Sequence, residues 1–102
     1  MNASFSLDAL MDFANLPKSQ QKVITRMIGR LMENPQSKAK GGYGIPLGNK
    51  GGNDLAGLLE GKLRGAGLRI IYKLDDHEAM EIIAIGARED EEIYGIAARR
   101  IS

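Results

Sequence analysis

Basic side chains recur along two neighbouring segments in the second half of the chain. Lys62 and Arg64 stand two residues apart in the first segment, and Arg69 and Lys73 stand four apart in the second. Side chains alternate between the two faces of a β-strand, so each pair shares one face of its strand, and Glu60 shares the face of Lys62. Unpaired cations are not left in an apolar core, so this face is either solvated or built to bind an anion.

Three apolar segments rich in branched residues predict the strands that carry these cations. They span 55–64, 68–74 and 79–87, and turns are expected at 65–67 and 75–78. Connections this short favour a meander of antiparallel strands. The sequence therefore predicts a small sheet that gathers several cations.

Helical patterns flank the predicted sheet. After a short strand at 5–7, apolar residues at helical spacing predict a short helix that reaches Ala14, and a longer amphipathic helix is predicted over 17–33. The longer helix carries a row of cations four apart, for which solvation is the simpler reading: Lys18, Lys22, Arg26 and Arg30. A last helix is predicted over 89–100. Four acidic residues fall in its first turn, where the positive end of the helix dipole stabilises negative charge.

A glycine-rich segment, 36–54, separates the long helix from the predicted strands. It contains six glycines and Pro46, which predicts a connection without regular structure. The spacing Gly-x-x-x-x-Gly-Lys-Ser/Thr of a phosphate-binding loop is absent. A flexible loop that carries Lys38, Lys40 and Lys50 is the favoured interpretation.

Composition limits the class of protein. The 102 residues are enough for one domain, 1–102, and the absence of cysteine excludes disulfides and thiolate metal sites. No apolar run reaches the roughly 20 residues that span a bilayer, and the first residues do not resemble a signal peptide. We therefore expect a soluble, cytoplasmic protein with no membrane partner.

The charge is unevenly distributed although the net charge is only +1. Residues 1–76 hold 11 Lys/Arg and 7 Asp/Glu, a balance of +4, and residues 77–102 hold 3 and 6, a balance of −3. Neutralisation of phosphates normally supplies most of the affinity for free nucleic acid. Any action on RNA is therefore expected to need a scaffold that concentrates the substrate.

The order of these motifs resembles the RelE/ParE superfamily of toxins from bacterial toxin–antitoxin systems. The resemblance rests on the residues at 61–64, at 67–72 and at 85–88, and on Tyr94 six residues after Arg88. It implies an α+β fold in which two N-terminal helices pack on an antiparallel sheet of three to four strands, followed by a C-terminal helical segment. Within the superfamily, the cationic residues favour the RelE branch.

The resemblance to the RelE branch implies a ribonuclease that cuts messenger RNA on the ribosome, with neither metal nor cofactor, by attack of a ribose 2′-hydroxyl on the adjacent phosphate. Lys62 would activate the nucleophile or stabilise the phosphorane, and Arg69 would hold the scissile phosphate. Arg88 would stabilise the developing charge or protonate the leaving oxygen, and Tyr94 would stack on a base. Two further cations, Arg64 and Lys73, are expected to bind RNA.

Two features depart from the family pattern. Glu60 stands where active members often carry a lysine, and it would either neutralise the site or serve as the general base itself. An acidic run at 89–92 follows Arg88 directly, and it would repel RNA if it faced the site.

The resemblance implies a cognate antitoxin, the ribosome and messenger RNA as partners, with operator DNA reached only through the antitoxin. Two alternatives to the nuclease remain open. One is a non-enzymatic inhibitor of DNA gyrase, as in the ParE branch, and the other is a non-toxic, degenerate member that acts as a binding or co-repressor module.

Overall fold

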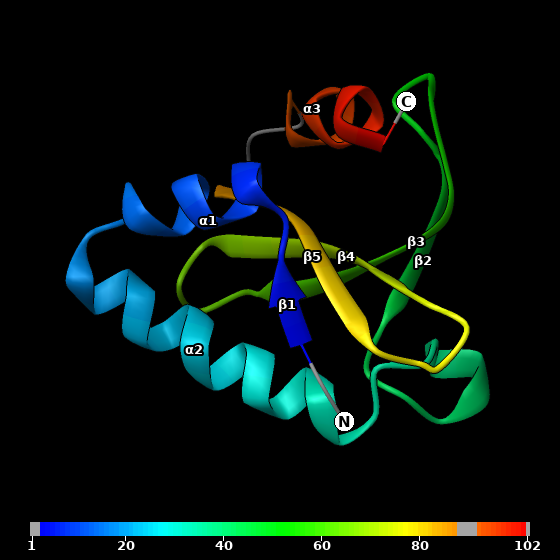
Figure 1. The fold of residues 1–102 in the computed structure, drawn as a ribbon, viewed down its shortest axis with the longest axis horizontal. Coiled ribbons are helices and arrows are strands. Elements are labelled where there is room, and N and C mark those ends of the chain that lie inside the picture. Colours follow the sequence, from blue (N-terminus) through cyan, green and yellow to red (C-terminus); the bar gives the residue numbers. More distant parts are fainter. Residues whose placement is uncertain (1–2, 88–91, 102) are drawn as a thin grey trace.

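The computed structural model describes residues 3–87 and 92–101, and their fold is α+β as predicted (Figure 1). In these residues the elements follow in the order β1 (Ala3–Phe5), α1 (Leu7–Ala14), α2 (Lys18–Glu33), a short 3-10 helix η1 (Lys38–Lys40), β2 (Ile45–Lys50), β3 (Asn53–Leu63), β4 (Leu68–Leu74), β5 (Met80–Ala87) and α3 (Glu92–Ile101). None of the described helices is long and apolar enough to cross a membrane.

The sheet is larger than the sequence predicted. Its five described strands lie in the order β1-β5-β4-β3-β2, and all neighbours are antiparallel except β1 and β5. The prediction of three to four antiparallel strands was therefore wrong in number and in this one parallel pair. β1 has only three residues, and no local pattern indicates which strand so short a segment will join.

The glycine-rich segment contains a strand, which corrects the prediction of an irregular loop. β2 pairs with β3 as a hairpin, and Gly51 and Gly52 form its turn with φ of +58° and +80°. Glycine adopts positive φ without steric cost, as tight hairpin turns require. Pro46 is tolerated because β2 is the edge of the sheet, and the pairing shifts register between Pro46 and Gly48.

The connection between α2 and β2 is also ordered. The backbone N–H of Tyr43 donates to the carbonyl of Asn34 at 3.0 Å, and the N–H groups of Gly42 and Gly44 donate to Ser37 and Gln36, both at 3.0 Å. A Cβ at Gly42 would lie 2.1 Å from the Gln36 oxygen, so only glycine fits there. This part of the predicted flexible loop is instead a compact turn held by backbone hydrogen bonds.

The sheet lies between α2 on one side and α3 on the other (Figure 1). Ile24 and Leu31 of α2 pack in the same buried cluster as Ile70 and Tyr72 of β4. On the opposite face, α3 contributes a second buried cluster with strand residues, namely Ile93, Tyr94, Ala97, Leu55, Ile71 and Ile83. The alternation of β4 residues between these two clusters explains why that strand is apolar on both faces.

Tyr72 carries a polar group into the first cluster. The side chain is fully buried, and its hydroxyl donates to the carbonyl of Pro35 at 2.8 Å. Burial raises the pKa of Tyr72 to about 12, because the phenolate would lose its hydration. The hydroxyl therefore joins the sheet to the segment that follows α2.

We expect the Tyr72 hydroxyl to make folding stability sensitive to strongly alkaline pH. The unfolded tyrosine ionises near pH 10 and the folded one near 12, so its contribution is complete below pH 10 and is lost as pH rises to 12. The loss is about 3 kcal/mol in the free energy of unfolding. Urea unfolding from pH 9 to 12 should show this excess loss relative to Tyr72→Phe, and parallel profiles would contradict it.

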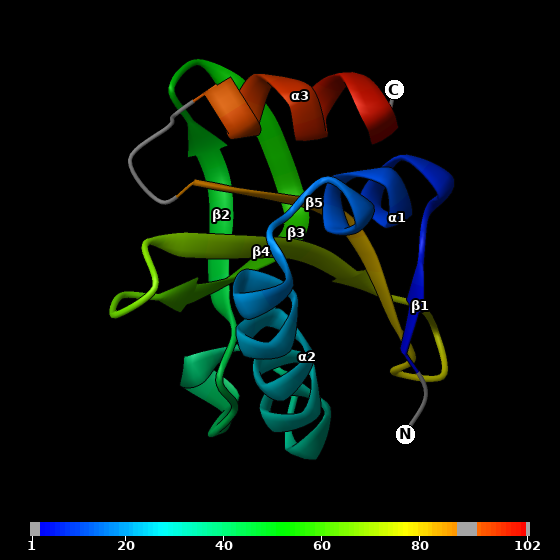
Figure 2. The same ribbon diagram turned by 90° about the vertical axis from the view of Figure 1, so that its left-hand side faces the viewer.

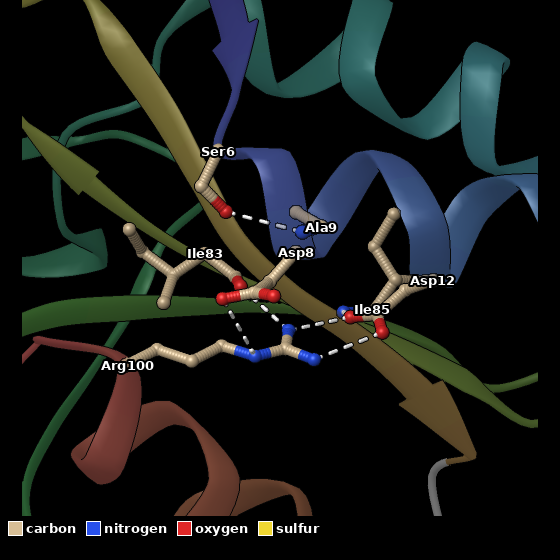
Figure 3. Close-up of polar contacts among 7 residues, drawn as sticks. All are labelled: Ser6, Asp8, Ala9, Asp12, Ile83, Ile85 and Arg100. Carbon is tan, nitrogen blue, oxygen red and sulfur yellow. Dashed lines mark hydrogen bonds and ion pairs between the residues drawn. The ribbon is translucent and has the colours of Figure 1, made fainter.

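A polar cluster closes the part of β5 that β1 leaves unpaired (Figure 3). Asp12 of α1 accepts from the backbone N–H of Ile85 at 3.0 Å and from both terminal nitrogens of Arg100, at 2.7 and 3.0 Å. Arg100 also donates to the carbonyl of Ile83 at 2.9 Å. The hydrogen-bonded Asp12 carboxylate raises the pKa of Arg100. This cluster ties the last turn of α3 to α1 and to the sheet edge.

We expect Asp12→Ala to lower the free energy of unfolding by about 2 to 3 kcal/mol, because hydrogen bonds to a charged group are lost and the Ile85 N–H is left without its acceptor. Asp8→Ala is the matched control, since Asp8 lies 4.0 Å from Arg100 and is 66% exposed. It should cost less than about 1 kcal/mol. Chemical denaturation measures both variants. Equal losses of unfolding free energy in Asp12→Ala and Asp8→Ala would show that the contacts of Asp12 with Ile85 and Arg100 add no stability of their own.

Candidate functional site

A buried polar group formed by Glu60, Arg69 and Tyr94 lies on the α3 side of the sheet. Nη1 of Arg69 lies 3.4 Å from Oε1 of Glu60 and donates to the hydroxyl oxygen of Tyr94. The Tyr94 hydroxyl in turn donates to Oε1 of Glu60 at 3.0 Å. The guanidinium also lies over the Tyr94 ring, 5.0 Å from its centroid. Three residues that the sequence singled out are therefore in contact.

The register of the strands explains this meeting. Lys62 of β3 lies opposite Arg69 of β4, and Glu60 is one step further along the same face, opposite Ile71. Arg69 thus reaches Glu60 diagonally across the strand pair. Tyr94 arrives from α3, next to Ile93, whose side chain lies against Gly86, where a Cβ would be 3.0 Å from Ile93 Cδ1.

Both charged members of the group are withdrawn from solvent. Glu60 is 1% exposed, Arg69 6% and Tyr94 3%. Oε2 of Glu60 and Nε of Arg69 are buried without a hydrogen-bond partner in the described part of the chain. A buried donor and acceptor that remain unused are costly, and in a native fold such groups need an explanation such as binding or catalysis.

Lys62 and Arg64 lie beside this group and not within it. Lys62 is half-buried and Arg64 exposed, and both line a hollow that faces α2. Arg64 follows the last residue of β3, so the predicted strand ended one residue too late. The two cations border the site at the end where β3 extends beyond the partner residues of β2.

Two further residues were predicted for the site, Lys73 and Arg88, and the described structure does not place either of them in this group. Lys73 is on the same strand as Arg69 but forms an exposed ion pair with Glu81 at 3.2 Å, so the structure does not bring it to Glu60 and Arg69. Arg88 and the acidic residues at 89–91 lie outside the described residues. Lys50 was not singled out for the site, yet its Nζ lies 5.7 Å from the centroid of the Tyr94 ring.

Lys50 was predicted to lie on a flexible loop, so it was not assigned to the site. If 45–50 had been predicted as a strand, its hairpin with the next strand would have placed Lys50 at the sheet. Among the described residues, no three histidine or acidic side chains gather in a way that could hold a metal ion.

The arrangement can bind and polarise an anion. Arginine presents a planar fork of donors that matches a phosphate, and in a water-poor site each aligned donor acts strongly on developing negative charge. A carboxylate beside it can accept a proton. Access is the constraint, because the Tyr94 side chain covers both groups in this conformation.

Comparison with known proteins gives one consistent result. The messenger RNA interferase toxin RelE of Escherichia coli K12 is 26% identical over 98 residues, which cover 95% of this chain and 93% of the relative. No protein-family model matches the chain.

Solved structures share the fold. A doubly substituted E. coli RelE toxin in the free state superposes with a TM-score of 0.74 at 22% identity, covering 99% of this chain and 97% of that one. A RelBE toxin–antitoxin complex from Mycobacterium tuberculosis gives 0.68 at 23% identity, with 87% and 92% covered. The chain is therefore similar along nearly its whole length to a RelE toxin, and it shares the fold of the solved RelE structures.

Proposed function

We propose that this protein is a toxin that cleaves messenger RNA on the ribosome, as a single domain that spans residues 1–102. The observation that supports it is the meeting of Arg69, Tyr94 and Glu60 on one sheet face, with Lys62 directly opposite Arg69. The RelE relative is named as a messenger RNA interferase, and the proposed activity is of that class.

In the proposed reaction the 2′-oxygen of a ribose attacks the adjacent phosphorus and the bond from phosphorus to the 5′-oxygen breaks. Arg69 holds the non-bridging oxygens of the scissile phosphate, and Lys62 adds positive charge as the phosphorane forms. Arg88, carried over from the family pattern, stabilises the charge that develops on the leaving 5′-oxygen or protonates it. Arg64 is proposed to bind the RNA backbone beside the site, and Lys73 remains a prediction as a further contact.

Glu60 is proposed as the base that takes the 2′-hydroxyl proton. Its Oε1 accepts from Tyr94, whereas Oε2 has no partner among the described residues. An acceptor held beside a cation and without a bond of its own suits this role in geometry. The glutamate thereby replaces the lysine that active family members often carry.

Binding of RNA requires Tyr94 to leave Glu60. The tyrosine hydroxyl occupies the space between the carboxylate and the guanidinium, and the ring is 3% exposed. Displacement of this side chain would free Arg69 for a phosphate and release the ring to stack on a base. α3 carries Tyr94, so the proposed step is a local shift of this helix.

A cognate antitoxin is the proposed inhibitor. The M. tuberculosis structure is described as a toxin–antitoxin complex, and this chain shares its fold. We propose that the antitoxin covers the sheet and its site, and that the ribosome supplies the message and the scaffold.

A second candidate, a non-toxic binding module, is favoured by one observation. The Glu60–Arg69 ion pair is closed and buried, which is also the state expected of a site retained only for structure. Such a protein would fold and bind an antitoxin without cutting RNA.

Controlled induction in a bacterial host separates the candidates. Incorporation of radiolabelled methionine and thymidine is followed while the 5′ ends of messenger RNA are mapped. Early loss of methionine incorporation, with new cuts inside translated frames, is the expected result. Loss of thymidine incorporation first would indicate a gyrase inhibitor, and growth without either loss would favour the binding module; both would overturn the nuclease.

A further inference from the structure

A cationic groove runs along α2 beside the candidate site. A hollow of about 720 Å³ lies between α2 and the turn that follows β3, and a smaller one of about 170 Å³ lies between α2, η1 and the start of β2. Met27, Arg30, Lys62 and Arg64 line both hollows, so the two form one continuous groove. Figure 2 shows the turn after β3 and η1 on the same side of α2.

Four cationic residues from three elements line the smaller hollow: Arg30 of α2, Lys38 of η1, Lys62 of β3 and Arg64 after it. None of the residues described along the groove carries a carboxylate. Within the described part of the chain, none of these four cations forms an ion pair. Because exposed lysines and arginines commonly pair with nearby acids, four unneutralised cations around one hollow attract an anion.

Tyr43 fixes the geometry of the groove. The guanidinium of Arg30 lies over its ring, 4.7 Å from the centroid. The backbone N–H of Tyr43 donates to Asn34, and Gly42 allows the tight turn that precedes it. The ring and the guanidinium are therefore held as a stacked pair on an ordered segment, which is a surface on which a nucleobase can lie.

The floor of the groove is apolar. Val23, Met27, Leu63 and Ala66 line the larger hollow between the cations. Single-stranded nucleic acid presents alternating phosphates and flat, apolar base faces, so a basic groove with an apolar floor and an aromatic platform fits it. From Ser19 to Arg30 the groove follows α2 for about 16 Å, at the helical rise of 1.5 Å per residue.

We propose that this groove binds the phosphodiester backbone of single-stranded RNA next to the cleavage site, with Arg30 and Lys38 as phosphate-binding residues and Tyr43 as a stacking residue. The proposal rests on the proposed function. Lys62 belongs to both places, since it lines the groove and lies opposite Arg69. An RNA strand held by Arg69 would continue past Lys62 into the groove. An acidic peptide would satisfy the charges, but it would not use the link to Arg69.

Binding to a non-cleavable probe tests this groove apart from catalysis. The probe is a fluorescent ten-nucleotide RNA with 2′-O-methyl groups, which lacks the attacking hydroxyl. Fluorescence anisotropy with purified protein should give a dissociation constant about tenfold weaker for Arg30→Ala and for Lys38→Ala than for the wild type. In each variant the slope of the logarithm of the binding constant against the logarithm of salt concentration should fall by the amount of about one phosphate contact.

Two matched controls stand close to these residues. Arg26 is one helical turn before Arg30 and lines a different hollow with Phe13 and Lys18. Lys40 shares η1 with Lys38 but borders a hollow on another side, with Pro46. Arg26→Ala and Lys40→Ala remove the same charge and should change the dissociation constant less than twofold. Thermal melting of all four variants checks that each is folded.

Three outcomes would overturn the proposal that this groove binds RNA. The first is an equal loss in the controls, which would reflect overall charge alone. The second is unchanged RNA binding in Arg30→Ala and Lys38→Ala. The third is the same loss toward a ten-residue polyglutamate as toward RNA, which would make the groove a general anion or acidic-peptide surface. Absence of toxicity on induction would overturn the proposed function while leaving the binding comparison intact.

Discussion

Arg69→Ala is expected to slow cleavage of messenger RNA by about 10² to 10³-fold, because one aligned donor to the developing phosphorane is lost. The measurement is single-turnover cleavage of a defined message on purified, stalled ribosomes. Arg69 is the residue on which the proposed chemistry depends most, since its guanidinium contacts both Glu60 and Tyr94.

Loss of folding must be separated from loss of chemistry in this experiment. Arg69→Ala leaves the Glu60 carboxylate buried without its cation, so Arg69→Lys is measured beside it. Lysine keeps the charge and the ion pair but not the planar fork of donors. The Arg69→Lys protein should therefore be stably folded and still cleave at least about tenfold more slowly than the wild type. Arg26→Ala is the charge control. Wild-type rates in both Arg69 variants would remove Arg69 from the mechanism.

Glu60→Gln is expected to lower the free energy of unfolding by about 3 to 5 kcal/mol. It breaks a buried ion pair whose side chains are 7% and 1% exposed, and it strands the Arg69 charge in the interior. Domains of this size are stable by about 5 to 15 kcal/mol, so the loss is a large fraction of the total. Urea denaturation at neutral pH measures it directly.

An exposed pair on the same sheet provides the control for Glu60. Lys73 and Glu81 lie 3.2 Å apart, but their side chains are 49% and 41% exposed, so Glu81→Gln should cost less than about 1 kcal/mol. Replacement of both buried partners, Glu60→Leu with Arg69→Met, should recover most of the stability, because no charge is then stranded. A Glu60→Gln protein as stable as Glu81→Gln would refute this account of the pair.

The elements with strong periodicity were predictable from the sequence. α2 begins one residue later than predicted and ends at the predicted residue, β4 has the predicted bounds, and β3 and β5 differ by one or two residues at their ends. Their apolar patterns are long, and proline or glycine marks several of their boundaries, so local preference and tertiary packing agree. β2 was missed because its glycines were interpreted as strand breakers, whereas edge pairing with β3 stabilises the segment.

The sequence by itself determined the α+β class, the strands that carry Lys62 and Arg69, and the resemblance to the RelE/ParE superfamily. These properties follow from residue order and side-chain alternation, which are local. The tertiary structure decided that Arg69 is paired with Glu60 beneath Tyr94, that Lys73 pairs with Glu81 instead, and that Arg30, Lys38 and Tyr43 join Lys62 along one groove. Strand register and helix packing bring together residues 7 to 34 positions apart, and no local pattern encodes those distances.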